Sequence, residues 1–255
     1  PQRIFWASIE GAIAAALTLS GAAFAEEAPK PTKKLKITAE LGVLVTTGNT
    51  ETSSYLGKLT ARQKLELWKN KYTLDFLLKE ADVVDANGNK VTQETDNRWT
   101  ATAKGNYTIS EKSSAFVFGS YADDEYGAYA TYATVSGGYS YQAMSREDMT
   151  LDLEAGLGFV DAKKQSGKSD SGVLYRGAAD FEWQINDMTQ FGQSLSIEHS
   201  PALDNTRTIS ETGISASFNS SMQMKFGYKI ISNSKVDPGF EKTDTETSVT
   251  LVVKF

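Results

Sequence analysis

The sequence has no cysteine and a single histidine, His199, among its 255 residues. Without thiols there is no disulfide framework, no zinc knuckle and no thiol nucleophile, and one imidazole cannot form a histidine-rich metal site. Basic residues are also outnumbered, because 26 lysines and arginines against 32 aspartates and glutamates give a net charge of −6. That balance argues against a nucleic-acid binder, which usually carries a basic face. We therefore expect no cofactor and no nucleic-acid partner.

The first 25 residues differ in character from the rest. The stretch from Ile4 to Ala25 is mostly apolar and ends in Ala23-Phe24-Ala25, an A-x-A cleavage pattern that two glutamates follow. This pattern predicts a secretory signal peptide over residues 1–25, and residues 26–35 then form a flexible lead-in. Glu10 interrupts the apolar stretch, so an uncleaved anchor helix is the alternative. Export together with the lack of cysteine indicates a protein of a Gram-negative envelope.

Prolines are few, five in all, whereas there are 20 glycines and 11 tyrosines, a mix that favours strands and turns over helices. From Lys36 onward, apolar and polar residues alternate with a period of two, as in a strand with two different faces. One run leaves its faces open, because Phe116-Val117-Phe118 is apolar throughout. The runs predict twelve strands, at residues 36–47, 52–66, 71–84, 94–109, 114–123, 128–142, 148–162, 172–186, 188–199, 205–219, 222–235 and 243–255.

The connections between the runs alternate in length. Five are tight and polar, such as Asn186-Asp187 and Asn219-Ser220-Ser221, and most of the others are longer. An even number of strands, with short turns at one end and longer loops at the other, is typical of an outer-membrane barrel. We therefore predict an all-β fold over residues 36–255: a closed antiparallel up-and-down transmembrane β-barrel of about twelve strands.

Alternation alone does not decide between a soluble barrel, which is apolar inside, and a membrane barrel, which is apolar outside. Aromatic residues near the strand ends favour the membrane barrel, since aromatic girdles are expected at both membrane interfaces. At the short-turn end they are Tyr72, Tyr107, Tyr141, Trp183, Phe191, Phe218 and Phe255, and at the long-loop end they are Tyr55, Tyr129, Phe159 and Tyr175. A soluble periplasmic barrel that binds small molecules is the alternative.

Several short motifs carry a resemblance to a known family. They are Leu41-Gly42 followed by Thr46-Thr47-Gly48-Asn49-Thr50, then Gly156-Leu157-Gly158-Phe159, then Asp237-Pro238-Gly239 followed by Lys242-Thr243-Asp244-Thr245, and the terminal Val252-Val253-Lys254-Phe255. With these motifs the chain resembles the "domain of unknown function 481" family, which includes YdiY-like and salt-induced outer membrane proteins. The resemblance extends from Leu35 to Phe255. It implies an outer-membrane β-barrel and implies no activity.

The end of the chain also resembles the terminal signal by which outer-membrane proteins are recognised for barrel insertion. Alternating apolar residues carry it: Val249, Leu251, Val253 and Phe255. We therefore expect this segment to act as a barrel-assembly signal.

The polar faces of the predicted strands carry charges that would line the lumen. They are Lys58, Arg62, Lys64, Asp75, Lys79, Lys104, Asp152, Glu154, Arg176, Asp180, Glu182, Glu198, Glu211, Lys225 and Lys229. Basic residues gather on the second to fourth strands and acidic residues on the seventh to tenth, so a basic wall faces an acidic wall in a closed barrel. Charges in a confined lumen must be paired or hydrated. The sequence therefore predicts either an internal ion-pair network or a narrow aqueous pore, and leaves both open.

No residue pattern indicates catalysis or a metal site. His199 and Ser200 are adjacent on a strand and point to opposite faces, so they make a poor lipid-hydrolase pair. Asp123-Asp124-Glu125 is better explained as solvated charge at a strand end than as a cation site. Gly137-Gly138 and Gly156-x-Gly158 are followed by no predicted helix, which a nucleotide loop requires, and instead indicate a bend or a close approach of strands.

Taken together, these patterns predict a monomeric outer-membrane barrel without enzymatic activity. It would be an envelope structural protein or a narrow passive pore for small solutes, and the family resemblance suggests a relation to salt or acid stress. The alternatives are a barrel-borne enzyme such as a lipid hydrolase and the soluble binding barrel. The expected partners are outer-membrane lipids, lipopolysaccharide, periplasmic chaperones and the barrel-assembly machinery.

Deletion of Phe255 should block assembly of the barrel. Phe255 completes the apolar face of the last strand, which must pair with the first strand to close the barrel. We expect an exported chain that is sensitive to protease and lacks heat-modifiable migration in gels. Normal membrane levels together with normal migration would contradict this role.

Overall fold

The computed structural model describes residues 34–46, 52–84 and 90–255, and within these ranges every regular element is a strand. The strands are β1 (Lys34–Thr46), β2 (Thr52–Lys64), β3 (Trp68–Val84), β4 (Lys90–Thr108), β5 (Ser113–Asp124), β6 (Tyr129–Ser145), β7 (Met149–Lys164), β8 (Ser169–Gln184), β9 (Thr189–Ser200), β10 (Asn205–Ser217), β11 (Met222–Asn233) and β12 (Thr243–Lys254). They confirm the twelve strands predicted from alternation. The predicted signal peptide, residues 1–25, and residues 26–33 of the lead-in lie outside the described residues.

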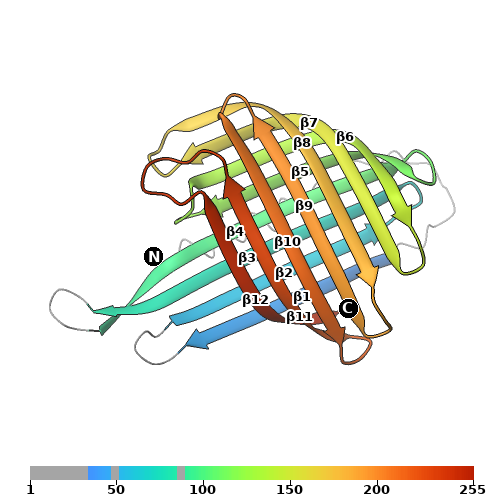
Figure 1. Ribbon diagram of the computed structural model, residues 1–255, viewed down its shortest axis with the longest axis horizontal. Helices are drawn as coiled ribbons and strands as arrows, with labels where there is room; N and C mark the ends of the chain where they lie inside the picture. Colours follow the sequence, from blue (N-terminus) through green and yellow to red (C-terminus); the bar gives the residue numbers. More distant parts are fainter. Residues whose placement is uncertain (1–33, 47–51, 85–89) are drawn as a thin grey trace, which may run out of the picture. The chain divides into compact units, whose positions relative to one another are not determined.

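Backbone pairing closes the strands into one antiparallel up-and-down barrel (Figure 1). Each strand pairs with its neighbours in sequence, and β12 returns to β1 through a short seam. In this seam residues 38–41 oppose residues 251–254. Ile37 and Phe255 then exchange backbone hydrogen bonds of 2.8 and 3.4 Å beside it. Closure gives hydrogen-bond partners to the backbone N–H and C=O groups of the edge strands. A sheet surrounded by hydrocarbon requires this, because lipid offers no such partners.

The two ends of the barrel differ. At the turn end lie the tight connections β2–β3, β4–β5, β6–β7, β8–β9 and β10–β11. Asn186 and Asn219 build two of these turns alike, because each side-chain oxygen accepts hydrogen bonds of 2.9–3.0 Å from the backbone N–H groups two and three residues further on.

The loop end holds the remaining connections, among them residues 125–128, 165–168, 201–204 and 234–242. The difference in length between the two ends is smaller than the sequence indicates, since three of these loops have only four residues. The β3–β4 hairpin instead extends past its neighbours at this end (Figure 1). Strand length rather than loop length therefore enlarges the loop end.

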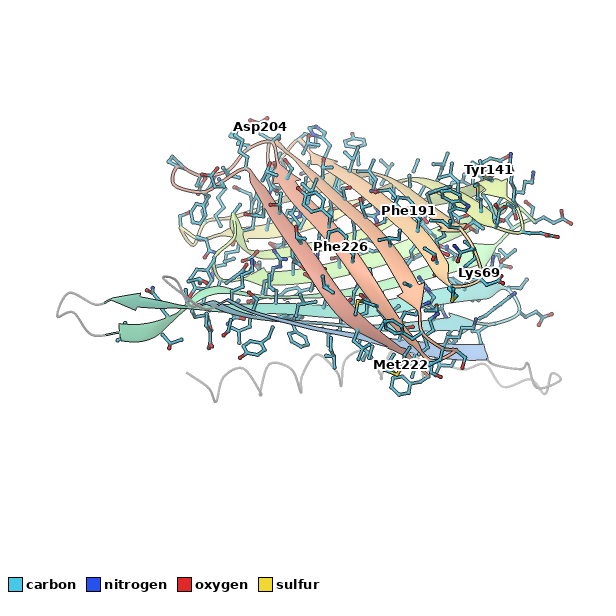
Figure 2. The ribbon with its side chains drawn as sticks, turned by 60° about the horizontal axis from the view of Figure 1, so that its bottom comes forward. Lys69, Tyr141, Phe191, Asp204, Met222 and Phe226 are labelled. Atoms are coloured by element: carbon cyan, nitrogen blue, oxygen red, sulfur yellow. The ribbon has the colours of Figure 1, made fainter. Side chains whose placement is uncertain are left out.

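Large apolar side chains point outward at alternate positions of the strands. Leu157 is 61% exposed, Val135 56% and Phe226 51%, although each lies within a strand (Phe226 is labelled in Figure 2). A protein surrounded by water rarely exposes so much apolar surface. An apolar exterior around a polar interior is the arrangement of a transmembrane barrel, so the soluble barrel does not fit.

The prediction that Tyr129 belongs to the aromatic girdle at the loop end is wrong. Tyr55, Phe159 and Tyr175 are exposed as expected, but Tyr129 is only 6% exposed, and its ring packs edge-on against Tyr132 with 5.4 Å between centroids. The pairing of β6 with β7 shifts register between Tyr129 and Thr131. A bulge of one residue moves the next side chain to the other face of the sheet, and so Tyr129 points inward.

The fifth strand, whose faces the sequence left open, has an aromatic inner face. Val117 is 56% exposed on the outside, whereas Phe116 is 2% exposed and packs against the β6–β7 wall. Gly156 makes room for this ring, because a Cβ there would lie 2.8 Å from Cζ of Phe116. A Cβ on Gly138 or Gly158 would lie 2.1 Å from a backbone oxygen of the paired strand. The glycines therefore mark a close approach of strands, as expected.

Adjacent positions of β7 test the two faces of the barrel. Leu153→Arg should destabilise the barrel by about 2–4 kcal/mol because the charge enters the lipid-facing surface, whereas Asp152→Arg should cost much less because it stays in the lumen. Chemical unfolding from liposomes measures both, and Leu153→Ala controls for the lost side chain. Equal tolerance of the two arginines would mean that the exterior does not contact lipid.

Candidate functional site

Ion pairs bridge the lumen between strands that are not neighbours in the wall. Lys58 on β2 reaches Glu211 on β10 at 2.9 Å. Lys225 on β11 lies between Glu211 on the neighbouring strand β10, at 3.2 Å, and Glu40 on β1, at 3.1 Å, so only the second of these contacts joins strands that are not neighbours. All four side chains are less than a third exposed. Each charge has lost part of its hydration, and the opposite charges compensate for that loss.

Two more ion pairs cross the same part of the lumen. Lys229 on β11 pairs with Asp75 on β3 at 3.5 Å, and Arg98 on β4 pairs with Glu246 on β12. We call the charged residues that meet here the central belt: Glu40, Lys58, Asp75, Arg98, Glu211, Lys225, Lys229 and Glu246. The belt carries four positive and four negative charges, so it is neutral as a whole.

The basic and acidic walls also meet closer to the turn end. Lys104 on β4 pairs with Glu154 on β7 and lies 3.8 Å from Asp180 on β8. Arg62 on β2 lies 3.6 Å from Glu182 on β8, and both side chains are more than half exposed. Water therefore reaches the second contact, while Glu154 is nearly fully buried. At this level, basic side chains of β2 and β4 approach acidic side chains of β7 and β8 across the lumen.

Other predicted lumenal charges pair within one wall. Arg176 on β8 bonds Glu198 on β9 at 2.5 Å, and its guanidinium stacks 4.0 Å above the ring of Phe118. Lys79 on β3 bonds Asp96 on β4 at 2.9 Å. These pairs join adjacent strands and do not cross the lumen.

Part of this network was not predicted from the sequence. Glu40, Arg98 and Glu246 in the central belt, and Lys71 further toward the turn end, were not assigned to the lumen. A signal for two of them was present, because Glu40 alternates with the apolar residues of its strand and Glu246 shares a face with Thr250. Extending the alternation to the ends of each run would have found them.

The lumen is packed with apolar side chains at the loop end. This loop-end plug consists of Ala128, Tyr129, Tyr132, Val160, Ala162, Leu174 and Leu203. Arg207 on β10 covers it from inside, with its guanidinium 4.6 Å from the ring of Tyr132. Asn205 and Asn233 bond each other at 3.1 Å beside it, and both are buried. No sequence pattern predicted the plug, since it joins the inner faces of β6–β8 to a loop.

Two lysine–aspartate contacts, which we call the loop latches, hold the loops at the loop end in place. Lys235 bonds Asp204 at 2.6 Å, and Lys164 bonds Asp237 at 2.7 Å (Asp204 is labelled in Figure 2). The hydrogen bond from each lysine lowers the pKa of its aspartate below the ordinary value. A lowered pKa means that the contact is present at neutral pH and is lost only as the pH falls through the lowered value. These loop latches therefore persist in mild acid.

Cavities decrease in size along the lumen. Of three cavities in the lumen, one of about 360 Å³ lies at the turn end, and Arg62, Lys71, Asp152, Asp180 and Glu182 are among its lining residues. A cavity of about 50 Å³ lies within the central belt, and one of about 20 Å³ lies beside the plug. Lys64, the remaining predicted lumenal residue, is exposed at the end of β2. The lumen is thus wide at the turn end and filled at the loop end.

The residues considered for catalysis and metal binding make contacts that hold the local structure. His199 Nδ1 lies 3.0 Å from the Thr206 hydroxyl, while Ser200 is 1% exposed on the opposite face. Asp124 accepts hydrogen bonds from the backbone N–H groups of Tyr126 and Gly127 at 3.2 and 2.7 Å, which fixes the loop. Among the described residues, no group of three or more histidine and carboxylate side chains could hold a metal ion. The same ranges contain no helix that could cross a membrane.

Substitution of Glu211 tests whether the barrel depends on the ion pairs of the central belt. Glu211→Gln should destabilise the barrel by about 1–3 kcal/mol, because Lys58 then stays in the lumen without its carboxylate. Adding Lys58→Met should recover most of the loss, since it removes the unpaired charge. Urea unfolding measures each variant. Glu182→Gln is the control, and its half-exposed pair should contribute less than about 1 kcal/mol. Equal effects of Glu211→Gln and Glu182→Gln would contradict the role of burial.

Comparisons with known proteins support the fold and assign the family. The outer membrane channel COG4313 from Pseudomonas putida F1 is similar, with a TM-score of 0.51 and 11% identity over 90% of this chain and 97% of that chain. The translocator domain of autotransporter NalP from Neisseria meningitidis has a TM-score of 0.47 and 11% identity, over 100% of this chain and 97% of its own. At 11% identity, the likeness to the COG4313 channel shows the fold alone. No curated protein matches the sequence. The family model described as "Protein of unknown function, DUF481" matches residues 39–255, so the chain belongs to this family, as its motifs predicted.

Proposed function

We propose that the protein lies in the outer membrane of a Gram-negative bacterium and forms a narrow passage for small polar solutes, without enzymatic activity. The observation that carries the proposal is the lumen, where charges of both signs line a series of cavities from the turn end to the loop end. Such a lining offers partners to water and to polar solutes. The apolar exterior supports the membrane location, because closed barrels satisfy every backbone group in lipid.

The passage is closed at the loop end in this conformation. Cavities of about 50 and 20 Å³ hold only a few water molecules. The obstruction includes Leu203 and Val236, which belong to loops and not to the barrel wall. A displacement of these loops would remove part of the obstruction without breaking strand pairing, while the plug residues on β6–β8 would stay in place. We therefore expect rare openings and a low conductance.

The proposal also implies which lipids and proteins contact the barrel. Outer-membrane lipids and lipopolysaccharide contact the apolar exterior, and periplasmic chaperones and the barrel-assembly machinery insert the exported chain. One chain closes the barrel by itself, so a monomer would suffice for the proposed passage. A role in salt or acid stress rests on the family resemblance only.

A structural role in the envelope is the second candidate. The central belt favours it, because ion pairs between strands on different sides of the lumen brace the barrel and narrow it. The two candidates differ in one property, since a structural barrel does not conduct in any state.

Conductance in planar lipid bilayers tests the passage. Wild-type protein should give small, infrequent steps, and Tyr132→Ala should give larger or longer ones, because it removes a buried ring of the plug. Tyr141→Ala is the matched control, since this tyrosine lies on the same strand and is 43% exposed on the exterior. It should conduct like the wild type.

Two outcomes would decide against parts of this proposal. A large, stable conductance of the wild type would contradict closure by the plug. If neither the wild type nor Tyr132→Ala conducts, while both migrate as folded barrels, the passage is refuted and the structural role is favoured.

A further inference from the structure

The cavity at the turn end has a basic side and an acidic side. Strand pairing places Lys71 on β3 between Arg62 on β2 and Lys104 on β4. On the other side it places Asp152 on β7 directly opposite Asp180 on β8. Like charges that face each other across a strand pair repel. Neither side of the cavity can therefore satisfy its own charges.

Contacts across the lumen satisfy only some of these charges. Lys104 and Arg62 reach carboxylates of β7 and β8. Lys71 and Asp152 both line the cavity, and in the described part of the chain neither forms an ion pair or a hydrogen bond. One positive and one negative group are thus left facing the same space.

We propose that this cavity binds a small zwitterion. Its anionic group would lie between Arg62 and Lys71, where it turns a repulsion into two attractions. Its cationic group would lie at Asp152 and Asp180, where the same argument holds with the signs reversed. A solute with one charge relieves only one side and leaves the other unpaired. The preference for a zwitterion follows from having both unpaired groups in one cavity.

The size and the lining of the cavity fit such a ligand. A volume of about 360 Å³ lies within the range of small-molecule pockets. Neutral hydrogen-bonding side chains from β9 and β11, Gln190, Ser194 and Gln223, complete the lining. The inference rests on the proposed function for the route of entry, and it names the class of solute that would pass.

Calorimetric titration of the wild-type barrel in an uncharged detergent at low salt tests the inference. The probes are ω-amino acids from glycine to 6-aminohexanoate. Each one is compared with two singly charged analogues of the same carbon chain, the carboxylate without the amine and the amine without the carboxylate. We expect at least one amino acid to bind about tenfold more tightly than both of its singly charged analogues. Added salt should weaken it. If no amino acid exceeds both analogues, the inference is wrong, and binding of the carboxylates alone would indicate a simple anion site.

Variants locate the binding in this cavity. Lys71→Met and Asp152→Asn should each remove the preference for the zwitterion. Lys163→Met and Asp161→Asn are matched controls on the exposed face of β7, and they should retain it. Heat-modifiable migration verifies the fold of each variant. An unchanged preference in both Lys71→Met and Asp152→Asn would overturn the inference. Binding is measured without conduction, so failure to bind leaves the passage standing, and a barrel that binds but never conducts refutes the passage alone.

Discussion

Charges confined in a closed lumen cannot all be hydrated, and much of this structure depends on that constraint. Lipid outside the wall requires apolar residues at alternate positions, so the polar residues of twelve strands point inward. The central belt resolves the resulting crowding by pairing cations of β2, β4 and β11 with carboxylates of β1, β3, β10 and β12. Loss of either partner leaves a desolvated charge. Each charge of the belt therefore depends on its partner, and the belt narrows the lumen.

The two ends of the lumen differ from the central belt in how they accommodate charge. At the loop end, the mostly apolar side chains of the plug fill the lumen, and the loops there are held by latches such as Lys235–Asp204, whose side chains are exposed. Exposed ion pairs contribute little to stability, so this end can move more easily than the paired strands below it. At the turn end the lumen is wide, and water hydrates the charges. A fixed wall with one movable end is suited to a passage that opens rarely.

Much of the wall could be predicted from the sequence, because lipid on one face and charge on the other force a period of two. The alternation was ambiguous at Phe116-Val117-Phe118, where the lumen is apolar and both faces look alike. It was wrong at Tyr129, because a bulge in β6 changes the face without changing the sequence pattern. The partners inside the lumen could not be predicted individually. Lys58 and Glu211 are 153 positions apart, and only the closure of the barrel brings them together.

Pairing along the lumen follows the access of water. In the narrow belt, the charges are paired and partly buried. In the wide cavity Arg62 and Glu182 are more than half exposed, and Lys71 and Asp152 have no ion-pair partner among the residues that the structure describes. Hydration makes such unpaired charges inexpensive where a dry lumen would not tolerate them. A solute that enters must displace this water, so the net gain from each charge contact is small. Under the proposal, binding in the cavity would be selective for charge pattern and weak enough for release, which a passage requires.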